Sequence, residues 1–208
     1  MTAENLPAFG NDILHFCSLA LVATRCRETL VRAISYIKQR DGLLSCDINL
    51  RAQMWPDAQE MLDTVRHFAL QADILKLSQE ELYWLAGTTQ HEKALEILRG
   101  YPSRLKVVTC GSNGAIVLWQ DRLVQVSAFQ VESLDTTGAG DAFIAGLLAS
   151  VAQGNTLDDL AQLKQAMTQA SACGALATTA KGALAALPDA QGATAFREEA
   201  PELRFEIE

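Results

Sequence analysis

The most informative stretch of the sequence is the run Asp135-Thr136-Thr137-Gly138-Ala139-Gly140-Asp141. Small residues ahead of a helix leave backbone N–H groups uncovered, and the helix dipole adds partial positive charge there. Asp141 would fall in the first helical turn, where its carboxylate can accept a proton from a hydroxyl held beside a bound phosphate. Phosphoryl transfer needs a base beside preorganised donors in this way. The alternative, a first-turn acid with glycines for tight packing, fits a lone Gly-x-Gly better than the whole run.

Three further polar clusters follow apolar runs of the chain. They cover residues 47–51, 76–81 and 109–114. In α/β folds, ligands bind at the carboxyl ends of the strands. We therefore expect these clusters and the run at 135–141 to converge on one cleft.

The elements that must position these clusters alternate between strand and helix. Apolar runs predict strands at 13–17, 43–46, 74–77 and 106–109, the first of them covered on both faces, and a hairpin of 115–119 with 123–126. Helical spacing predicts helices that end near residue 41, follow Pro56, cover 80–86 and 91–99, follow Gly140, and run over about 163–179. This order predicts an α/β fold, a three-layer αβα sandwich with a mostly parallel sheet. With no internal linker, residues 1–208 are expected to form a single domain.

Composition excludes several functions. The 208 residues carry 17 Lys and Arg against 25 Asp and Glu, a net charge of −8, which disfavours nucleic acid and anionic membranes as partners. The five cysteines lack a Cys-x-x-Cys pair and the three histidines lack ligand spacing, so we expect no disulfide framework or zinc site. The apolar run at 13–23 is too short to span a bilayer, and no basic segment precedes it. A cytoplasmic protein is expected.

The segment 135–143 resembles the second signature of the ribokinase-like (PfkB) carbohydrate kinases. The resemblance extends from about Leu6 to Pro188. Residues 173–183, and residues 47–51 followed by Met54 and Trp55, resemble the bacterial fructokinases and the related aminoimidazole riboside kinases. The seven-residue signature is specific for the family, and the two flanking runs narrow the subgroup less sharply.

The resemblance implies roles for single residues. Asp141 would be the general base that deprotonates the sugar hydroxyl, and Gly138, Ala139 and Gly140 would form the anion hole for the transferred phosphoryl group. Arg51 matches a substrate contact of the riboside kinase branch. The alternative for Arg51, a solvated loop cation, stays open.

The resemblance also implies two ATP-binding segments and two metal sites. The nucleotide segments would be Lys76, Leu77, Ser78, Gln79, Glu80 and Glu81, and the turn of Thr109, Cys110, Gly111, Ser112, Asn113 and Gly114. Ser78 replaces the Asn of the family's Asn-x-x-Glu motif, while Glu81 keeps the acidic position that organises Mg²⁺ through water and phosphate. Taken alone, Glu80 and Glu81 would be read as a first-turn acidic pair. A K⁺ site would use Asp135, Thr137 and carbonyls near Ala177, Ala180 and Gly182.

The expected activity is ATP-dependent phosphorylation of a sugar, with fructose converted to fructose 6-phosphate. Aminoimidazole riboside kinase and 2-keto-3-deoxygluconate kinase are the alternatives within this class. Compared with relatives, the chain is expected to lack the N-terminal strands and the β lid that closes over the sugar. A non-catalytic remnant is therefore the alternative of another class, and we expect little turnover from this polypeptide alone. A homodimer stays open as its assembly.

Overall fold

The computed structural model describes residues 12–155 and 157–208. The chain folds into two compact units, Met1–Val108 (unit 1) and Thr109–Glu208 (unit 2). The expectation of one domain over residues 1–208 stays a prediction.

Unit 1 alternates strands with helices, as the sequence predicts. Its strands are β1 (Ile13–Cys17), β2 (Leu43–Asp47), β3 (Ile74–Ser78) and β4 (Leu105–Thr109). Its helices are α1 (Thr24–Lys38), α2 (Ala58–Ala69), α3 (Gln79–Ala86) and α4 (His91–Arg99), with short 3₁₀ turns at Ser18–Leu21 and Ala52–Met54.

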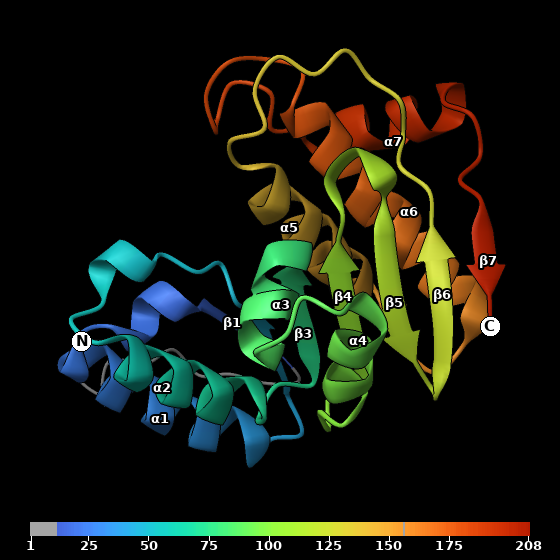
Figure 1. The fold of residues 1–208 in the computed structure, drawn as a ribbon. Coiled ribbons are helices and arrows are strands. Elements are labelled where there is room, and N and C mark those ends of the chain that lie inside the picture. The colour runs from blue at the N-terminus through green and yellow to red at the C-terminus, as the bar shows by residue number, and fades with distance from the viewer. Residues whose placement is uncertain (1–11, 156) are drawn as a thin grey trace. The chain divides into compact units, whose positions relative to one another are not determined.

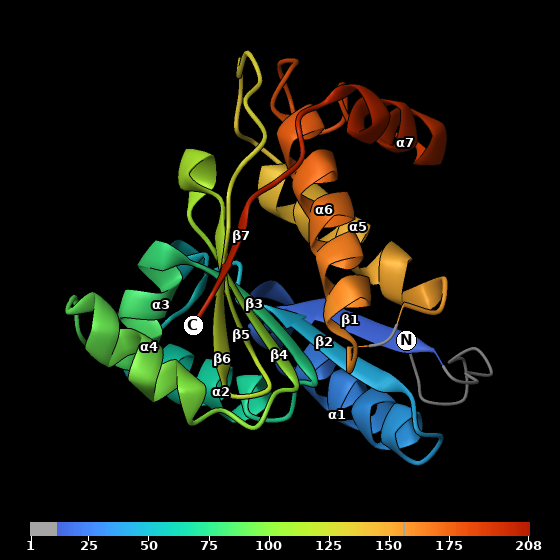
Figure 2. The ribbon, with the colours of Figure 1, turned by 90° about the vertical axis from the view of Figure 1, so that its right-hand side faces the viewer.

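The strands of unit 1 lie in chain order. β1 pairs with β2 and β2 with β3, both in parallel, and β4 follows β3 in the sheet. The four helices lie along one face of these strands (Figure 2). This arrangement is expected when successive parallel strands are joined by crossovers of one hand.

The core of unit 1 comes from the apolar spacing seen in the sequence. Leu30, Ile34 and Ile37 recur at helical spacing and are buried on α1, which packs on β1 and β2. Each such side chain contributes about 1.5–3 kcal/mol when fully buried. β1 is less covered than predicted, because Phe16 is its only buried residue. Among the described strands it pairs with β2 alone, so one of its edges lacks a neighbour.

Unit 2 combines an antiparallel ribbon with packed helices. Its elements are β5 (Ala115–Trp119), β6 (Arg122–Val126), α5 (Ala139–Ala152), α6 (Leu160–Ala177), α7 (Ala190–Glu199) and β7 (Phe205–Ile207), with a 3₁₀ turn at Gly111–Asn113. β5, β6 and β7 pair in antiparallel order. The predicted hairpin is confirmed, and its two turn residues, Gln120 and Asp121, have φ of 47° and 62°. Two successive positive φ values are typical of the type I′ turns that join twisted strands.

Helices α5 and α6 lie side by side in both views (Figures 1 and 2). Glycines permit this close approach. A Cβ at Gly146 would fall 2.9 Å from Cys173 Sγ, and one at Gly174 would fall 3.3 Å from the Ala139 carbonyl oxygen. The small residues of the last long predicted helix therefore do pack against a neighbour, as their composition indicates.

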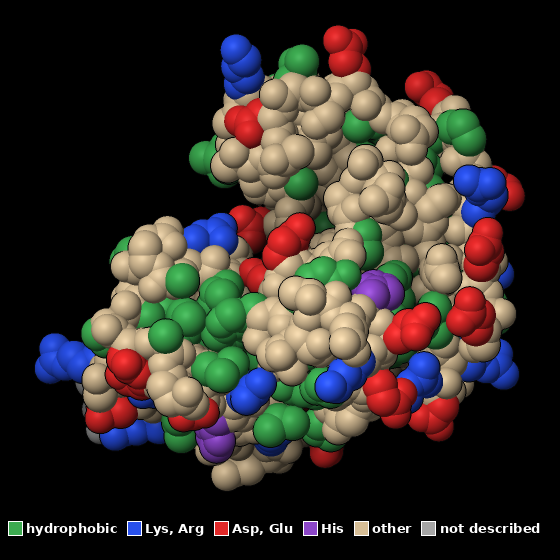
Figure 3. All heavy atoms as spheres, viewed as in Figure 1, with side chains coloured by type: hydrophobic (Ala, Val, Ile, Leu, Met, Phe, Trp, Pro, Cys, Tyr) green, Lys and Arg blue, Asp and Glu red, His purple; other side chains and the backbone are tan. Residues whose placement is uncertain are grey.

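Among the α-helices and strands of the described residues, α7 and β7 were not predicted from the sequence. Across the described residues, no helix is long and apolar enough to cross a membrane. On the face drawn in Figure 3, acidic and basic side chains are interspersed.

Candidate functional site

The loop ahead of α5 is organised around Asp135. Its Oδ1 accepts hydrogen bonds from the backbone N–H and the hydroxyl of Thr137, at 2.9 and 2.7 Å. Its Oδ2 accepts one from the Gly182 N–H at 2.8 Å. These bonds, that from Gly182 foremost, hold the pKa of the Asp135 carboxyl below its usual value. One carboxylate thus joins two loops that are 47 residues apart in sequence.

Helix α5 begins at a backbone position suited to glycine. Gly138 has φ +84°, and a Cβ there would fall 3.1 Å from the Ala183 carbonyl oxygen. Gly138 has no side chain that could cap the helix, and Ala139 and Gly140 add little bulk at its first turn. Asp141 lies in this first turn and is exposed. The arrangement is the helix N-terminus with an adjacent carboxylate that the sequence predicts.

The proposed K⁺ ligands are partly brought together. Asp135, Thr137 and Gly182 are linked directly by hydrogen bonds. Ala177 is the last residue of α6, and the next carbonyl, that of Thr178, accepts the N–H groups of Leu134 and Asp135 at 2.8 and 3.2 Å. Ala180 lies in the same connecting loop as Gly182. The described residues contain no cluster of three or more His, Cys, Asp or Glu side chains that could bind a metal ion by themselves.

In unit 1, the turn that leaves β2 carries Arg51. The Arg51 side chain is exposed, and its Nη1 donates to the Leu50 carbonyl at 3.0 Å. Asn49, two residues earlier, has φ +35°, a left-handed conformation that Asn tolerates better than most residues. Arg51 therefore extends from a turn of unusual backbone conformation.

The segment Lys76–Glu81 spans the end of β3 and the start of α3. Lys76 is buried, with 5% of its surface exposed, and its Nζ donates to Asp47 Oδ2 at 2.8 Å. Leu77 is also buried, whereas Ser78, Gln79, Glu80 and Glu81 reach the surface in part or fully. In the structure the Lys76 ammonium group forms a buried ion pair with Asp47. Its expected contact with ATP stays a prediction.

Ser78 and Glu81 form a capping box at the start of α3. The Ser78 hydroxyl accepts the Glu81 N–H at 3.2 Å, and Glu81 Oε2 accepts the Ser78 N–H at 2.8 Å. Glu81 Oε1 accepts a further bond from the Leu50 N–H at 2.6 Å. Both carboxylate oxygens of Glu81 therefore accept backbone amides, and its expected indirect role at Mg²⁺ stays a prediction.

The turn Thr109–Gly114 follows β4. It is closed by the Cys110 N–H, which donates to the Gly114 carbonyl at 2.8 Å. Gly114 has φ +93°, and a Cβ there would lie 1.9 Å from the Val126 carbonyl oxygen, so any side chain would force the backbone to shift. Gly111 has φ +57° and no atom within 4 Å of its Cβ position. The two glycines serve different needs, close packing at Gly114 and a left-handed turn at Gly111.

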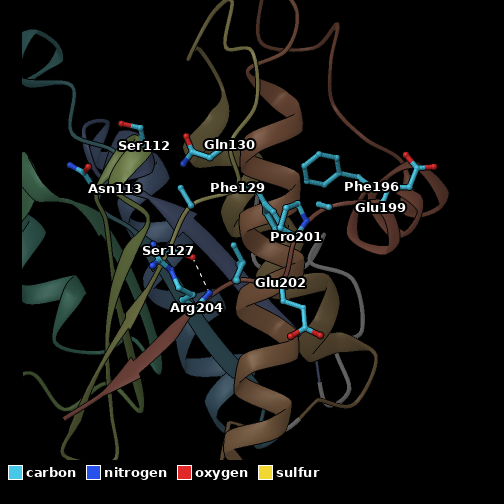
Figure 4. A pocket seen from close by; sticks show the side chains of 13 residues that line it. Ser112, Asn113, Ser127, Phe129, Gln130, Phe196, Glu199, Pro201, Glu202 and Arg204 are labelled. Carbon is cyan, nitrogen blue, oxygen red and sulfur yellow. Dashed lines mark hydrogen bonds between the residues drawn. The ribbon is translucent and has the colours of Figure 1, made fainter.

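A pocket of about 620 Å³ borders this turn within unit 2 (Figure 4). Its walls come from the turn, the segment after β6, α7 and the chain that follows α7, and they include Ser112, Asn113, Phe129, Gln130, Phe196 and Arg204. The rings of Phe129 and Phe196 meet edge to face with centroids 5.1 Å apart. The predicted nucleotide turn therefore adjoins open space large enough for a small ligand.

Two of the four predicted clusters lie in unit 1 and two in unit 2, and their convergence on one cleft stays a prediction. The sequence did not single out Ser18, whose hydroxyl donates to the Asn49 carbonyl at 3.1 Å. It also gave no reason to connect Asp47 with Lys76, which are 29 residues apart. Strand pairing between β2 and β3 brings the last two together.

Comparison with known proteins points to one family. Residues 2–190 match the family model of the pfkB family carbohydrate kinases. A fructokinase from Salmonella thompson is 39% identical over 190 residues, which cover 90% of this chain and 86% of the relative. A fructokinase from Salmonella typhimurium is also 39% identical, and there the match covers 62% of the relative.

Solved structures agree in fold. A Vibrio cholerae fructokinase with bound fructose, ADP and calcium ion has a TM-score of 0.89 and 38% identity, covering 94% of this chain and 64% of that one. An aminoimidazole riboside kinase from Salmonella enterica, complexed with aminoimidazole riboside and an ATP analog, has a TM-score of 0.87 and 33% identity, covering 94% and 66%. The predicted ribokinase-like α/β fold class is confirmed. This chain spans less than two thirds of the Salmonella typhimurium and Vibrio relatives.

Proposed function

The chain belongs to the pfkB family of carbohydrate kinases, and on that premise we propose that it transfers the γ-phosphoryl group of ATP to a sugar hydroxyl. The proposed sugar is fructose and the product fructose 6-phosphate. The substrate class is supported by the fructokinases that match about 90% of the chain at 39% identity.

One observation carries the proposal from family to chemistry. The uncapped start of α5 at Gly138 and the exposed carboxylate of Asp141 lie within a single helical turn. Uncovered backbone N–H groups and the helix dipole favour an anion at this place. A base within the same turn can then reach a hydroxyl that attacks the bound phosphate.

The reaction assigns one role to each group. Asp141 accepts the proton of the sugar hydroxyl, whose oxygen forms a bond to the γ-phosphorus. The bond from that phosphorus to the oxygen it shares with the β-phosphate breaks, and ADP leaves. Gly138, Ala139 and Gly140 would present backbone N–H groups to the negative charge on the transferred group, and for this the Ala139 N–H must leave the Thr136 carbonyl, to which it donates at 3.2 Å.

The residues present fit the expected metal ions. Asp135 and Thr137, with the carbonyls of Ala177, Ala180 and Gly182, would hold K⁺ through oxygen atoms, and bound K⁺ would stabilise the loop ahead of α5. Asp135 keeps its loop beside Gly182 through the bond of 2.8 Å. Glu81, whose oxygens bind backbone amides at 2.6 and 2.8 Å, would influence Mg²⁺ only indirectly.

Aminoimidazole riboside is the second candidate sugar. A riboside kinase from Salmonella typhimurium is 34% identical over 189 residues, and the Salmonella enterica structure bound to that riboside has a TM-score of 0.87. 2-Keto-3-deoxygluconate stays an alternative. Arg51, the proposed substrate contact, occurs in a run that resembles both subgroups, so it does not separate fructose from the riboside.

The test is ADP release by the 208-residue chain with ATP, Mg²⁺ and K⁺. Fructose and aminoimidazole riboside are added separately. Asp141→Asn is compared with Asp63→Asn, because Asp63 is an exposed aspartate on α2 with no proposed role. Fructose-dependent release that only Asp141→Asn abolishes supports the proposal. ADP release with the riboside alone would make aminoimidazole riboside, and not fructose, the proposed substrate. No release with either sugar, beside an active relative, favours the non-catalytic alternative.

A further inference from the structure

The turn from Asp47 to Leu50 is held at successive residues by different parts of unit 1. The Ile48 N–H donates to the Lys76 carbonyl at 2.9 Å. The Asn49 carbonyl accepts the buried Ser18 hydroxyl at 3.1 Å. Asp47 is itself buried and paired with the Lys76 ammonium group at 2.8 Å. The backbone ahead of Arg51 is thus fixed by β3 and by the 3₁₀ turn that follows β1.

The last anchor before Arg51 is Glu81. Its Oε1 accepts the Leu50 N–H at 2.6 Å, across 31 residues of sequence. A capping box needs only the exchange between Ser78 and Glu81 at the helix start. The bond to Leu50 is additional, and a hydrogen bond to a charged acceptor is among the stronger ones.

The backbone conformation explains why this anchor matters. Asn49 has φ +35°, in the left-handed region that L-residues adopt at an energetic disadvantage. Such a conformation persists when the surrounding contacts over-determine it. Without the Glu81 acceptor, Leu50 would keep a half-buried N–H with no carboxylate to bind, and the turn would be free to relax toward ordinary φ values.

We infer that Glu81 is a positioning residue for the sugar side of the reaction, acting through the Leu50 amide to hold Arg51 in place. The inference rests on the proposed function, because it takes Arg51 as a substrate contact. Glu81 therefore joins the start of α3, which belongs to the expected nucleotide segment, to the turn expected to meet the sugar. Loss of the carboxylate should weaken sugar binding even where ATP binding is kept.

The first arm of the test does not depend on turnover. Amide hydrogen exchange at Leu50 is compared in the wild type, in Glu81→Ala and in Glu92→Ala. Glu92 is a matched control, since it is an exposed first-turn acid on α4 of the same unit. We expect protection at Leu50 to fall about tenfold or more in Glu81→Ala alone, as for a lost bond to a charged group. Equal protection in all three proteins overturns the inference.

A second variant guards against a folding defect. Glu81→Gln keeps the size of the side chain and an acceptor suited to a capping box, but its single carbonyl oxygen cannot serve both amides as the carboxylate does. Its circular dichroism should match the wild type, with Leu50 protection between those of the wild type and Glu81→Ala. Leu50 protection that follows global unfolding in every variant contradicts the inference.

The second arm measures kinetics. Glu81→Ala should raise the KM for fructose about tenfold. The effect should be non-additive with Arg51→Ala, because the carboxylate acts through the arginine turn. A change confined to the KM for ATP or to kcat, or full additivity with Arg51→Ala, overturns the inference. If the wild type has no turnover, the proposed function fails, while exchange at Leu50 still decides whether Glu81 holds the turn.

Discussion

Gly114 offers the sharpest test of the packing in unit 2. Its φ is +93°, and a Cβ there would meet the Val126 carbonyl oxygen at 1.9 Å and two further backbone atoms of the next residues at 2.8 and 2.9 Å. These atoms belong to the main chain of β6 and its continuation, so they cannot rotate away as a side chain would. Gly111 is the matched control, because its φ is also positive, at +57°, but nothing lies within 4 Å.

The expected magnitudes follow from these two environments. A non-glycine residue in a sparsely populated backbone region costs about 1–3 kcal/mol. Overpacking against a fixed neighbour adds about 1–3 kcal/mol. Replacing glycine by alanine also reduces the entropy of the unfolded chain, which offsets about 0.4–1 kcal/mol. We therefore expect Gly114→Ala to lower the free energy of unfolding by about 2–4 kcal/mol, and Gly111→Ala to lower it by about 1–3 kcal/mol less than that, because overpacking is absent there.

Urea unfolding followed by circular dichroism measures both variants. With a slope of about 2 kcal/mol per molar urea, Gly114→Ala should lower the midpoint by about 1–2 M. If the two variants differ by less than about 0.5 kcal/mol, the contact between Gly114 and Val126 is not made and the steric reasoning is wrong. Gly111→Ala has a second use, because a raised KM for ATP in a stable variant would support the proposed nucleotide turn.

Three further changes test other parts of the structure. Lys76→Met leaves the Asp47 carboxylate buried without its ion-pair partner and should destabilise the chain by about 3–5 kcal/mol in urea unfolding. The double variant Lys76→Met/Asp47→Leu should restore most of this loss. Equal losses in the single and the double variant would refute the ion pair. The pKa of Asp135 is lowered in the folded chain, so its contribution to stability is present above about pH 4 and is lost as pH falls through the folded pKa. The difference in unfolding free energy between the wild type and Asp135→Asn should therefore become smaller in acid. A difference that stays constant with pH would contradict the hydrogen bonds of Asp135. Burial, and to a lesser extent the nearby Asp47 carboxylate, raise the pKa of the Cys46 thiol well above its usual value. At pH 8 a thiol reagent should therefore modify the exposed Cys26 quickly and Cys46 only after unfolding. Prompt labelling of both cysteines would show that β2 is not buried.

Local patterns in the sequence predicted most of the elements. The hairpin of β5 and β6 and helix α4 lie within a residue of their expected bounds. Alternation, helical spacing and turn residues act over a few positions, so they can be read along the chain. The elements α7 and β7 were missed because a short helix with one buried residue, Ala193, and a strand of three residues carry little pattern.

The same contrast holds for the candidate site. The sequence by itself determined the family, the helix start at the run from Asp135 to Asp141 and the glycine-containing turn at 109–114. Each of these depends on neighbouring residues. Tertiary structure alone decided that Lys76 forms an ion pair with Asp47, that Asp135 accepts the Gly182 N–H, and that Glu81 accepts the Leu50 N–H. These partners are 29, 47 and 31 residues apart, and strand pairing and loop packing set their distances. A local pattern cannot specify such contacts, because they depend on where the whole unit places two distant segments.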